Sequence, residues 1–372
     1  MTSLEAVGQV GLSEPKHAAD VWDFRILCIG ETWYGSDARA AFAALRRLGH
    51  SVQVLDENNY VPLYWQTKVS KGIRKIFRPL FVRELLLDAC RHIGRFKPHC
   101  LFVFKGNWVH PEVVDYCRRQ GVSTANYYPD VSFLSHGPYI PRTLPRYDRV
   151  FTAKTYGVGD MQSLLGLDNV SFLAPGYDPE LHRPVELSAE EQETFGCDVA
   201  FIGTWSPKKE AMLAALRREL PHIKMKIWGS QWGKSRSNNL QECIMGDSVI
   251  GNEYVKAICG SSICLGLLSE QGRGASSGDL ITARTFQIPA CRTLMLHERN
   301  PEVLQYFAEG REAAFFSTPS EAAQMIRYFL SRPREREEVA LNGLKRVRQD
   351  GYSIDERMKV VSQWLAERVS VA

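Results

Sequence analysis

The stretch SSICLGLLSEQGRGASSGDLITARTFQIPACRTLMLHE, residues 261–298, has the pattern of a strand, a glycine-rich loop, a helix and a second strand. Apolar runs at 263–268 and 294–296 mark the strands. The loop contains Gly272, Gly274 and Gly278. In such a unit the carboxyl end of a strand lies beside the amino end of a helix, where backbone N–H groups and the helix dipole favour an anion. Arg284, early in the expected helix, supplies a charge-assisted contact to the same anion.

The spacing across this helix and the residues within it are more specific. Asp279 and Gln287 stand eight residues apart, which is about two helical turns, so they share one face. Residues 284–291 read RTFQIPAC. This run resembles the C-terminal signature R-T-F-E-I-P-A-C-G of the CgeB-like, spore maturation protein type branch of the group 1 glycosyltransferases. The resemblance extends over residues 198–364 and, more weakly, through the first half of the chain.

The resemblance implies an α/β protein with two Rossmann-like, doubly wound domains facing a cleft, the GT-B-type glycosyltransferase fold. It also implies a hexosyltransferase that uses a nucleotide-diphosphate sugar. In the wider superfamily two acidic residues eight apart contact the donor, the first near the sugar and the second on the ribose. Asp279 takes the first role, whereas Gln287 replaces the second acid and Arg292 replaces a usual Gly. A carboxylate accepts from both ribose hydroxyls but an amide accepts only at one end, so Gln287 either binds ribose in an altered geometry or weakens donor binding.

Composition limits the class of protein. The 372 residues suffice for two domains, and 44% hydrophobic and 24% charged residues are typical of a soluble globular protein. No apolar run approaches the roughly 20 residues needed to span a bilayer. Residues 1–22 lack the features of a secretory signal and are predicted to be a disordered lead. The net charge of +4 is too small to indicate nucleic-acid binding.

The nine cysteines show no CxxC spacing and no Cys/His cluster. This pattern favours reduced thiols in a cytoplasmic protein and gives no support for a zinc site. The sequence also contains no Asp-x-Asp metal motif. We therefore expect no metal and no cofactor, with the nucleotide sugar acting as a substrate.

Residues 23–175 are predicted to form an acceptor-side domain in which strands alternate with helices, the pattern of a parallel doubly wound sheet. The expected strands are 24–30, 51–55, 100–104 and 122–128, and the expected helices are 38–48, 81–96 and 111–120. Ligands in such sheets gather at the carboxyl ends of the strands. Asp130 follows one strand end, and the resemblance places its segment beside the cleft, so Asp130 and His136 are candidate acceptor-side residues.

Residues 68–81, KVSKGIRKIFRPLF, place five basic residues at helical spacing beside apolar ones. A basic amphipathic segment can lie on an anionic membrane surface or meet an acidic acceptor, and it can equally be a solvated helix face. Gly72 and Pro79 are expected to interrupt the helix. A peripheral contact with the inner face of a membrane is therefore one open interpretation.

The remaining chain is predicted to contain a linker at 176–196, a donor domain at 197–352 and a C-terminal helix at 353–372 that packs back on the first domain. Candidate donor contacts lie in the strand-to-helix loops. They are Gly203, Lys208, Lys209, Trp228 or Trp232, Arg273, Gly274, Gly278, Thr285 and Gln287. For Trp228, core packing is an equal alternative to a base platform. Thr318 with Glu321, and Ser353 with Glu356, have the spacing of capping boxes that open two helices.

Breaking the bond between sugar and phosphate builds charge on the diphosphate, which the protein must stabilise. We expect Arg284, Arg273 and Lys208 or Lys209 to hold this charge without a metal, and Asp279 to orient the sugar. The resemblance implies retention of anomeric configuration. Two alternatives stay open: a nucleotide-sugar binding protein that has lost catalysis, suggested by Gln287 and Arg292, and a nucleotide-sugar epimerase. The sugar, the base, the acceptor and the oligomeric state are not determined by the sequence.

Overall fold

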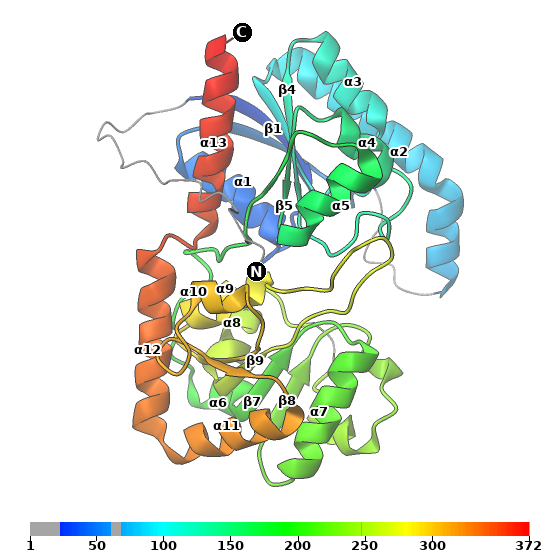
Figure 1. Ribbon diagram of the computed structural model, residues 1–372. Helices are drawn as coiled ribbons and strands as arrows, with labels where there is room; N and C mark the ends of the chain where they lie inside the picture. Colours follow the sequence, from blue (N-terminus) through cyan, green and yellow to red (C-terminus); the bar gives the residue numbers. More distant parts are fainter. Residues whose placement is uncertain (1–22, 61–67, 247, 372) are drawn as a thin grey trace, which may run out of the picture.

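The computed structural model describes residues 23–60, 68–246 and 248–371 (Figure 1). Two parallel sheets, each flanked by helices, form two lobes. This arrangement confirms the expected pair of Rossmann-like domains. The predicted disordered lead lies outside the described residues.

The first lobe is built on a six-stranded parallel sheet of order β2-β1-β3-β4-β5-β6. Its strands are β1 (Arg25–Gly30), β2 (Ser51–Asp56), β3 (Cys100–Phe104), β4 (Ser123–Tyr128), β5 (Arg149–Thr152) and β6 (Val170–Phe172). Its helices are α1 (Asp37–Arg47), α2 (Lys68–Phe96), α3 (Pro111–Arg119), α4 (Ile140–Thr143) and α5 (Thr155–Leu165), with 3-10 turns at Glu57–Asn59 and Leu144–Arg146. Every residue of β3 is buried, as expected for a strand covered by helices on both faces.

The second lobe is built on a five-stranded parallel sheet of order β11-β10-β9-β7-β8. Its strands are β7 (Cys197–Ile202), β8 (Met225–Trp228), β9 (Ser261–Gly266), β10 (Leu294–Glu298) and β11 (Ala314–Phe316). Its helices are α6 (Ala189–Phe195), α7 (Pro207–Glu219), α8 (Asn252–Cys259), α9 (Ala283–Ala290), α10 (Val303–Tyr306), α11 (Pro319–Ser331) and α12 (Pro333–Gln349), with 3-10 turns at Trp232–Lys234 and Asn238–Cys243. Residues 261–298, for which the sequence predicts a strand, a glycine-rich loop, a helix and a strand, thus form β9, a long loop, α9 and β10.

The last helix, α13 (Ile354–Val371), runs along the first lobe rather than the second (Figure 1). Met358, Val361 and Leu365 are buried in a core that includes Phe42 and Leu45 of α1. The chain therefore begins and ends its described part on the same lobe.

Helix starts follow the capping chemistry of the sequence. The Thr318 hydroxyl accepts from the N–H of Glu321 at the start of α11, and the Ser353 hydroxyl accepts from the N–H of Glu356 at the start of α13. A capping box that the sequence analysis did not identify, Ser188 with Glu191, opens α6 inside the stretch expected to be a linker.

The expected interruption of helix α2 was wrong. The helix runs unbroken from Lys68 to Phe96 with Pro79 inside it. Val82, Leu85 and Ala89 are buried at helical spacing, and this packing holds the helix on the sheet. Among the described residues, no helix is both long and apolar enough to cross a bilayer.

Candidate functional site

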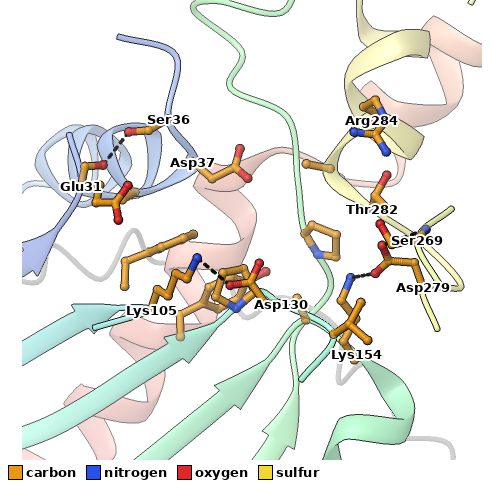
Figure 2. A pocket seen from close by; sticks show the side chains of 18 of the residues that line it. Glu31, Ser36, Asp37, Lys105, Asp130, Lys154, Ser269, Asp279, Thr282 and Arg284 are labelled. Atoms are coloured by element: carbon orange, nitrogen blue, oxygen red, sulfur yellow. Dashed lines mark hydrogen bonds and ion pairs between the residues drawn. The ribbon is translucent and has the colours of Figure 1, made fainter. Parts of the chain in front are cut away.

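Each sheet contains one point at which the direction of strand addition reverses. In the first sheet β2 and β3 lie on opposite sides of β1, and in the second sheet β8 and β9 lie on opposite sides of β7. The loops after the two neighbouring strands diverge at such a point and leave a crevice at the carboxyl ends. A cavity of about 470 Å³ is lined by residues that follow β1, β3, β7 and β9, so it lies between the two crevices (Figure 2).

The first lobe contributes three carboxylates to the lining of this cavity, together with two lysines and a histidine. Glu31 and Asp37 follow β1, and Asp130 follows β4. Burial raises the pKa of Glu31, and burial together with Asp130 raises the pKa of Asp37 to about 6. Because these carboxylates line one cavity, this wall is suited to accept hydrogen bonds from hydroxyl groups.

Asp130 is held in its ionised form by two basic neighbours. Lys105 Nζ lies 2.8 Å from Asp130 Oδ2, and His136 Nε2 lies 3.7 Å from the same oxygen. Burial acts to raise the pKa of Asp130, but Lys105 and His136 outweigh it and hold the pKa below its ordinary value. Burial lowers the pKa of His136, which favours the neutral imidazole, the form that can accept a proton.

One ion pair joins the two lobes at the cavity wall. Lys154, which follows β5, places its Nζ 2.5 Å from Asp279 Oδ1, and the two side chains are 6% and 8% exposed. Lys154 Nζ also donates to the carbonyl of Ile281 at 3.2 Å. Asp279 therefore points into the cavity, as its predicted role requires, with its charge balanced by a residue of the other lobe (Figure 2).

The second lobe supplies two cations at the same cavity. Arg284, in the first turn of α9, donates to the carbonyl of Leu267 at 3.0 Å. Lys209 Nζ donates to the carbonyl of Thr204 at 3.3 Å and to Ser269 Oγ at 3.1 Å. Burial and the nearby Arg284 lower the pKa of Lys209 to about 8. The positive charges of Lys209 and Arg284 at one cavity favour the binding of an anion there.

A smaller cavity of about 280 Å³ adjoins the first. Asp37, Thr204 and Arg284 line both cavities, so these residues lie at the junction. The smaller cavity is also lined by Gln287, Tyr254 and four glycines, Gly35, Gly203, Gly229 and Gly251. An anion on Arg284 would therefore have access to the larger cavity on one side and the smaller cavity on the other.

Several predicted donor contacts do not line either cavity. Trp228 is 4% exposed and its ring lies 6.3 Å from that of Phe195, so it packs in the core. Trp232 is also buried and donates its Nε1–H to the carbonyl of Gly203 at 2.9 Å. Lys208 pairs with Glu298 at 2.5 Å instead of reaching the cavity.

The remaining predicted contacts shape the loop and helix around the site. Thr285 is fully buried, and its Oγ1 accepts from the N–H of Thr282 at the start of α9. The carbonyl of Arg273 accepts from the Ser132 hydroxyl of the first lobe, and Gly274 and Gly278 sit where a Cβ would clash with neighbouring atoms. Arg273 therefore anchors the loop through its backbone and does not line the cavity.

The sequence analysis missed residues that the structure brings to the site. Asp37 and Lys154 each follow a strand of the first sheet, and Tyr254 lies on α8. The rule that ligands gather at the carboxyl ends of parallel strands applies to Lys154 as it does to Asp130. In the described part of the chain, no group of three or more His, Cys, Asp or Glu side chains is placed to hold a metal ion.

Comparison with solved structures identifies the fold. The sucrose-phosphate synthase of Thermosynechococcus elongatus superposes with a TM-score of 0.65 at 12% identity, covering 94% of this chain and 100% of that one. HepE of Anabaena, solved with UDP-glucose, gives 0.58 at 10% identity with coverages of 94% and 100%. A putative UDP-N-acetylglucosamine 2-epimerase of Listeria monocytogenes gives 0.57 at 9% identity with coverages of 94% and 98%.

The match to a protein-family model lies in the second half of the chain. Residues 208–363 match a family model described as glycosyl transferase-like. No curated protein sequence gives a significant match. The chain thus has the two-domain GT-B fold, and residues 208–363 are similar to the glycosyl transferase-like family.

Proposed function

We propose that this protein transfers a sugar, of the hexose type, from a nucleotide-diphosphate sugar to an acceptor, without a metal ion or cofactor. One observation carries the proposal: Arg284, at the amino end of α9, lines two adjoining cavities between the lobes, and Lys209 lines the larger of them within electrostatic reach of Arg284. A diphosphate is the anion that suits this place, because it links a nucleoside to a sugar and two cavities adjoin it.

In this proposal the diphosphate leaves with its developing charge on Arg284, Lys209 and the free N–H groups of α9. The sugar occupies the larger cavity, where Asp279 orients its hydroxyl groups. Asp130 and His136 lie on the opposite wall and orient the acceptor hydroxyl. We propose a retaining outcome from the CgeB-like resemblance, and NMR of the anomeric proton in the first product formed tests it.

The donor class is suggested by the comparisons. HepE of Anabaena is described in complex with UDP-glucose, and it shares the fold. We propose a nucleotide sugar of this class, with the nucleoside in the smaller cavity. Specificity for one base or sugar depends on a few loop contacts, so a panel of donors is the appropriate probe.

The experiment measures release of nucleoside diphosphate from a panel of nucleotide sugars in the presence of EDTA, with and without glycan, lipid-linked and small-molecule acceptors. The proposal predicts release from one donor that rises with one acceptor. Arg284→Ala should abolish most of it, and Arg334→Ala, at an exposed site on α12, should not. Release that requires a divalent metal, or that survives Arg284→Ala, would contradict the assignment.

The same experiment separates the alternative functions. Glu31, Asp37 and Asp130 line one cavity, so the structure offers carboxylates of the kind an epimerase needs. An epimerase would convert the nucleotide sugar to its epimer with no acceptor and no release of nucleoside diphosphate. A binding protein that has lost catalysis would retain the donor unchanged with every acceptor.

We also propose a peripheral contact with an anionic membrane, through the first half of α2, on the cytoplasmic side. The side chains of Ile76, Phe77 and Leu80 are 74%, 45% and 58% exposed. They form an apolar group within the basic segment 68–81. The side chains of residues 68–75 lie outside the described part, and Arg78 lies over the Trp108 ring at 5.5 Å. A solvated helix face remains the alternative.

Co-sedimentation with vesicles tests this contact. Binding to vesicles with a quarter anionic lipid, weakened by Phe77→Ser with Leu80→Ser and absent with neutral lipid, would support it. Equal recovery in the supernatant with both kinds of vesicle would favour the solvated face.

A further inference from the structure

The side chain of Gln287 makes one hydrogen bond within the protein at each end of its amide. The Tyr254 hydroxyl donates to Gln287 Oε1 at 2.7 Å, and Gln287 Nε2 donates to Asp37 Oδ1 at 3.3 Å. Gln287 is only 6% exposed. Both ends of the amide are therefore used, and the reversed amide would place an oxygen against the Asp37 carboxylate.

Asp37 reaches this position because the loop after β1 is docked on the second lobe. The Tyr34 hydroxyl donates to Asn252 Oδ1 at 2.8 Å. Gly35, at φ +91°, approaches so closely that a Cβ would lie 2.7 Å from the backbone nitrogen of Gly251. Asp37 follows at the first turn of α1 and lines both cavities, facing Arg284 across the larger one (Figure 2).

If a diphosphate binds Arg284, the arrangement of the two cavities places the attached nucleoside beside Asp37. Arg284 lines both cavities, so a diphosphate on Arg284 directs the sugar into the cavity that contains Asp279 and the nucleoside into the one that contains Gln287. The ribose is attached directly to the diphosphate, so it lies at the junction, which Asp37 lines. The smaller cavity, beyond the ribose, is the space left for the base.

We propose that Asp37 is the carboxylate that accepts the ribose hydroxyls of the donor nucleotide, and that Gln287 acts as its positioning residue. The proposal rests on the proposed function. The carboxylate expected at position 287 has in effect moved to position 37, on the opposite lobe. An acid at 287 would place two carboxylates within hydrogen-bond distance of each other, whereas an amide donates to Asp37 and fixes its orientation.

The chemistry of Asp37 fits a hydroxyl pair. Among the described residues, Gln287 is the only hydrogen-bond donor recorded to this carboxylate, so Oδ2 is available. Two vicinal hydroxyls can donate to the two carboxylate oxygens, which an amide cannot match. Because burial disfavours the charged form of Asp37, two donated hydrogen bonds would satisfy a group that is otherwise poorly solvated.

The test measures ribose recognition directly. Dissociation constants are determined by calorimetry for the diphosphates of uridine, adenosine, guanosine and cytidine and for their 2′-deoxy counterparts. The proteins are the wild type, Asp37→Asn, Gln287→Glu and the exchanged double variant Asp37→Asn/Gln287→Glu. Hydrogen bonds to a charged group predict that the wild type prefers the ribonucleotide by about 10- to 100-fold.

We expect Asp37→Asn to reduce this preference to about threefold or less, and Gln287→Glu to reduce it as well because the two acids repel. The double variant should regain most of the preference, since amide and carboxylate have exchanged places. Melting temperatures confirm that each variant is folded.

The outcomes distinguish this inference from the proposed function. If no nucleoside diphosphate binds the wild type, the proposed function fails. If one binds but the preference for ribose is unchanged in Asp37→Asn, only the role of Asp37 is overturned. If Asp37→Asn loses the preference and the double variant does not regain it, the positioning role of Gln287 is overturned.

Discussion

The two walls of the cleft differ in charge and in how they are built. The second-lobe wall presents the cations Lys209 and Arg284 beside a helix start, whereas the first-lobe wall presents the carboxylates Glu31, Asp37 and Asp130. Anions are favoured on one wall and hydroxyl groups on the other. In the proposed function, this difference favours the second lobe for the diphosphate, and the space between the walls for the sugar and ribose hydroxyls.

Among the described residues, one ion pair joins the two walls directly. Lys154 of the first lobe pairs with Asp279 of the second, and both are nearly buried. Lys105, which pairs with Asp130, is a second cation of the first-lobe wall. The pair of Lys154 and Asp279 joins the two lobes and holds Asp279 at the cavity.

Removing a cation from the second-lobe wall should give the largest effect. Arg284→Ala is expected to lower turnover about 10²- to 10³-fold, because one charge-stabilising donor is lost where charge develops in the transition state. Initial rates of nucleoside diphosphate release measure it, with Arg334→Ala as the control. Turnover within about threefold of the wild type would show that the cationic wall does not hold the leaving group.

Removing the cation that joins the walls should act on stability. Lys154→Met leaves the Asp279 carboxylate buried without a partner, and we expect a loss of about 3 kcal/mol in the free energy of unfolding. Urea denaturation measures it. Adding Asp279→Asn to Lys154→Met should restore at least half of the loss.

The exposed pair of Lys359 and Glu356 on α13 provides the matched control for this experiment. Lys359→Met should change the free energy of unfolding by less than about 0.5 kcal/mol. A similar small change for Lys154→Met would mean that the ion pair does not hold the walls together.

Neutralising a carboxylate of the first-lobe wall should stabilise the free protein. Burial raises the pKa of Asp37 to about 6 from an ordinary value of 3.8, so its ionised form is disfavoured in the folded state. Asp37→Asn is therefore expected to raise the free energy of unfolding by about 1–2 kcal/mol at pH 7.5. Urea denaturation at fixed pH measures the difference.

The sign of the pH dependence follows from the same shift. Asp130 and Asp178 raise the pKa of Asp37, while Arg284 and Gln287 lower it. A raised folded-state pKa means that the protonated group stabilises the fold below about pH 4, and that this contribution is lost as the pH rises through about 6. The difference between Asp37→Asn and the wild type should thus grow between pH 4 and 6 and stay constant above pH 7. If the difference in unfolding free energy between Asp37→Asn and the wild type does not change with pH, the ionisation of Asp37 is not its source.

The two walls also differ in how far the sequence predicts them. The α/β alternation predicted both sheets, because buried parallel strands and amphipathic helices carry strong local patterns. On the second-lobe wall, Asp279 and Arg284 were predicted because both belong to one strand-loop-helix unit. Lys209 was predicted because it follows the neighbouring strand, β7.

The first-lobe wall was predicted less well. Asp130 and His136 lie close together in the sequence after one strand, whereas Asp37 becomes a site residue only because its loop docks on Gly251 of the other lobe. Trp228 illustrates the opposite case, since an aromatic residue at a strand end can face the core as easily as the cleft. Such choices depend on long-range packing, which no local pattern encodes.

The measurement that tests the central claim most directly is calorimetric titration of nucleoside diphosphates in EDTA. The account predicts that at least one binds the wild type, that Lys209→Ala and Arg284→Ala each weaken it by about tenfold or more, and that Lys345→Ala, at an exposed site, leaves it unchanged. Absence of binding for every nucleoside diphosphate, or binding that both cleft variants leave intact, would contradict the assignment of the diphosphate to this wall.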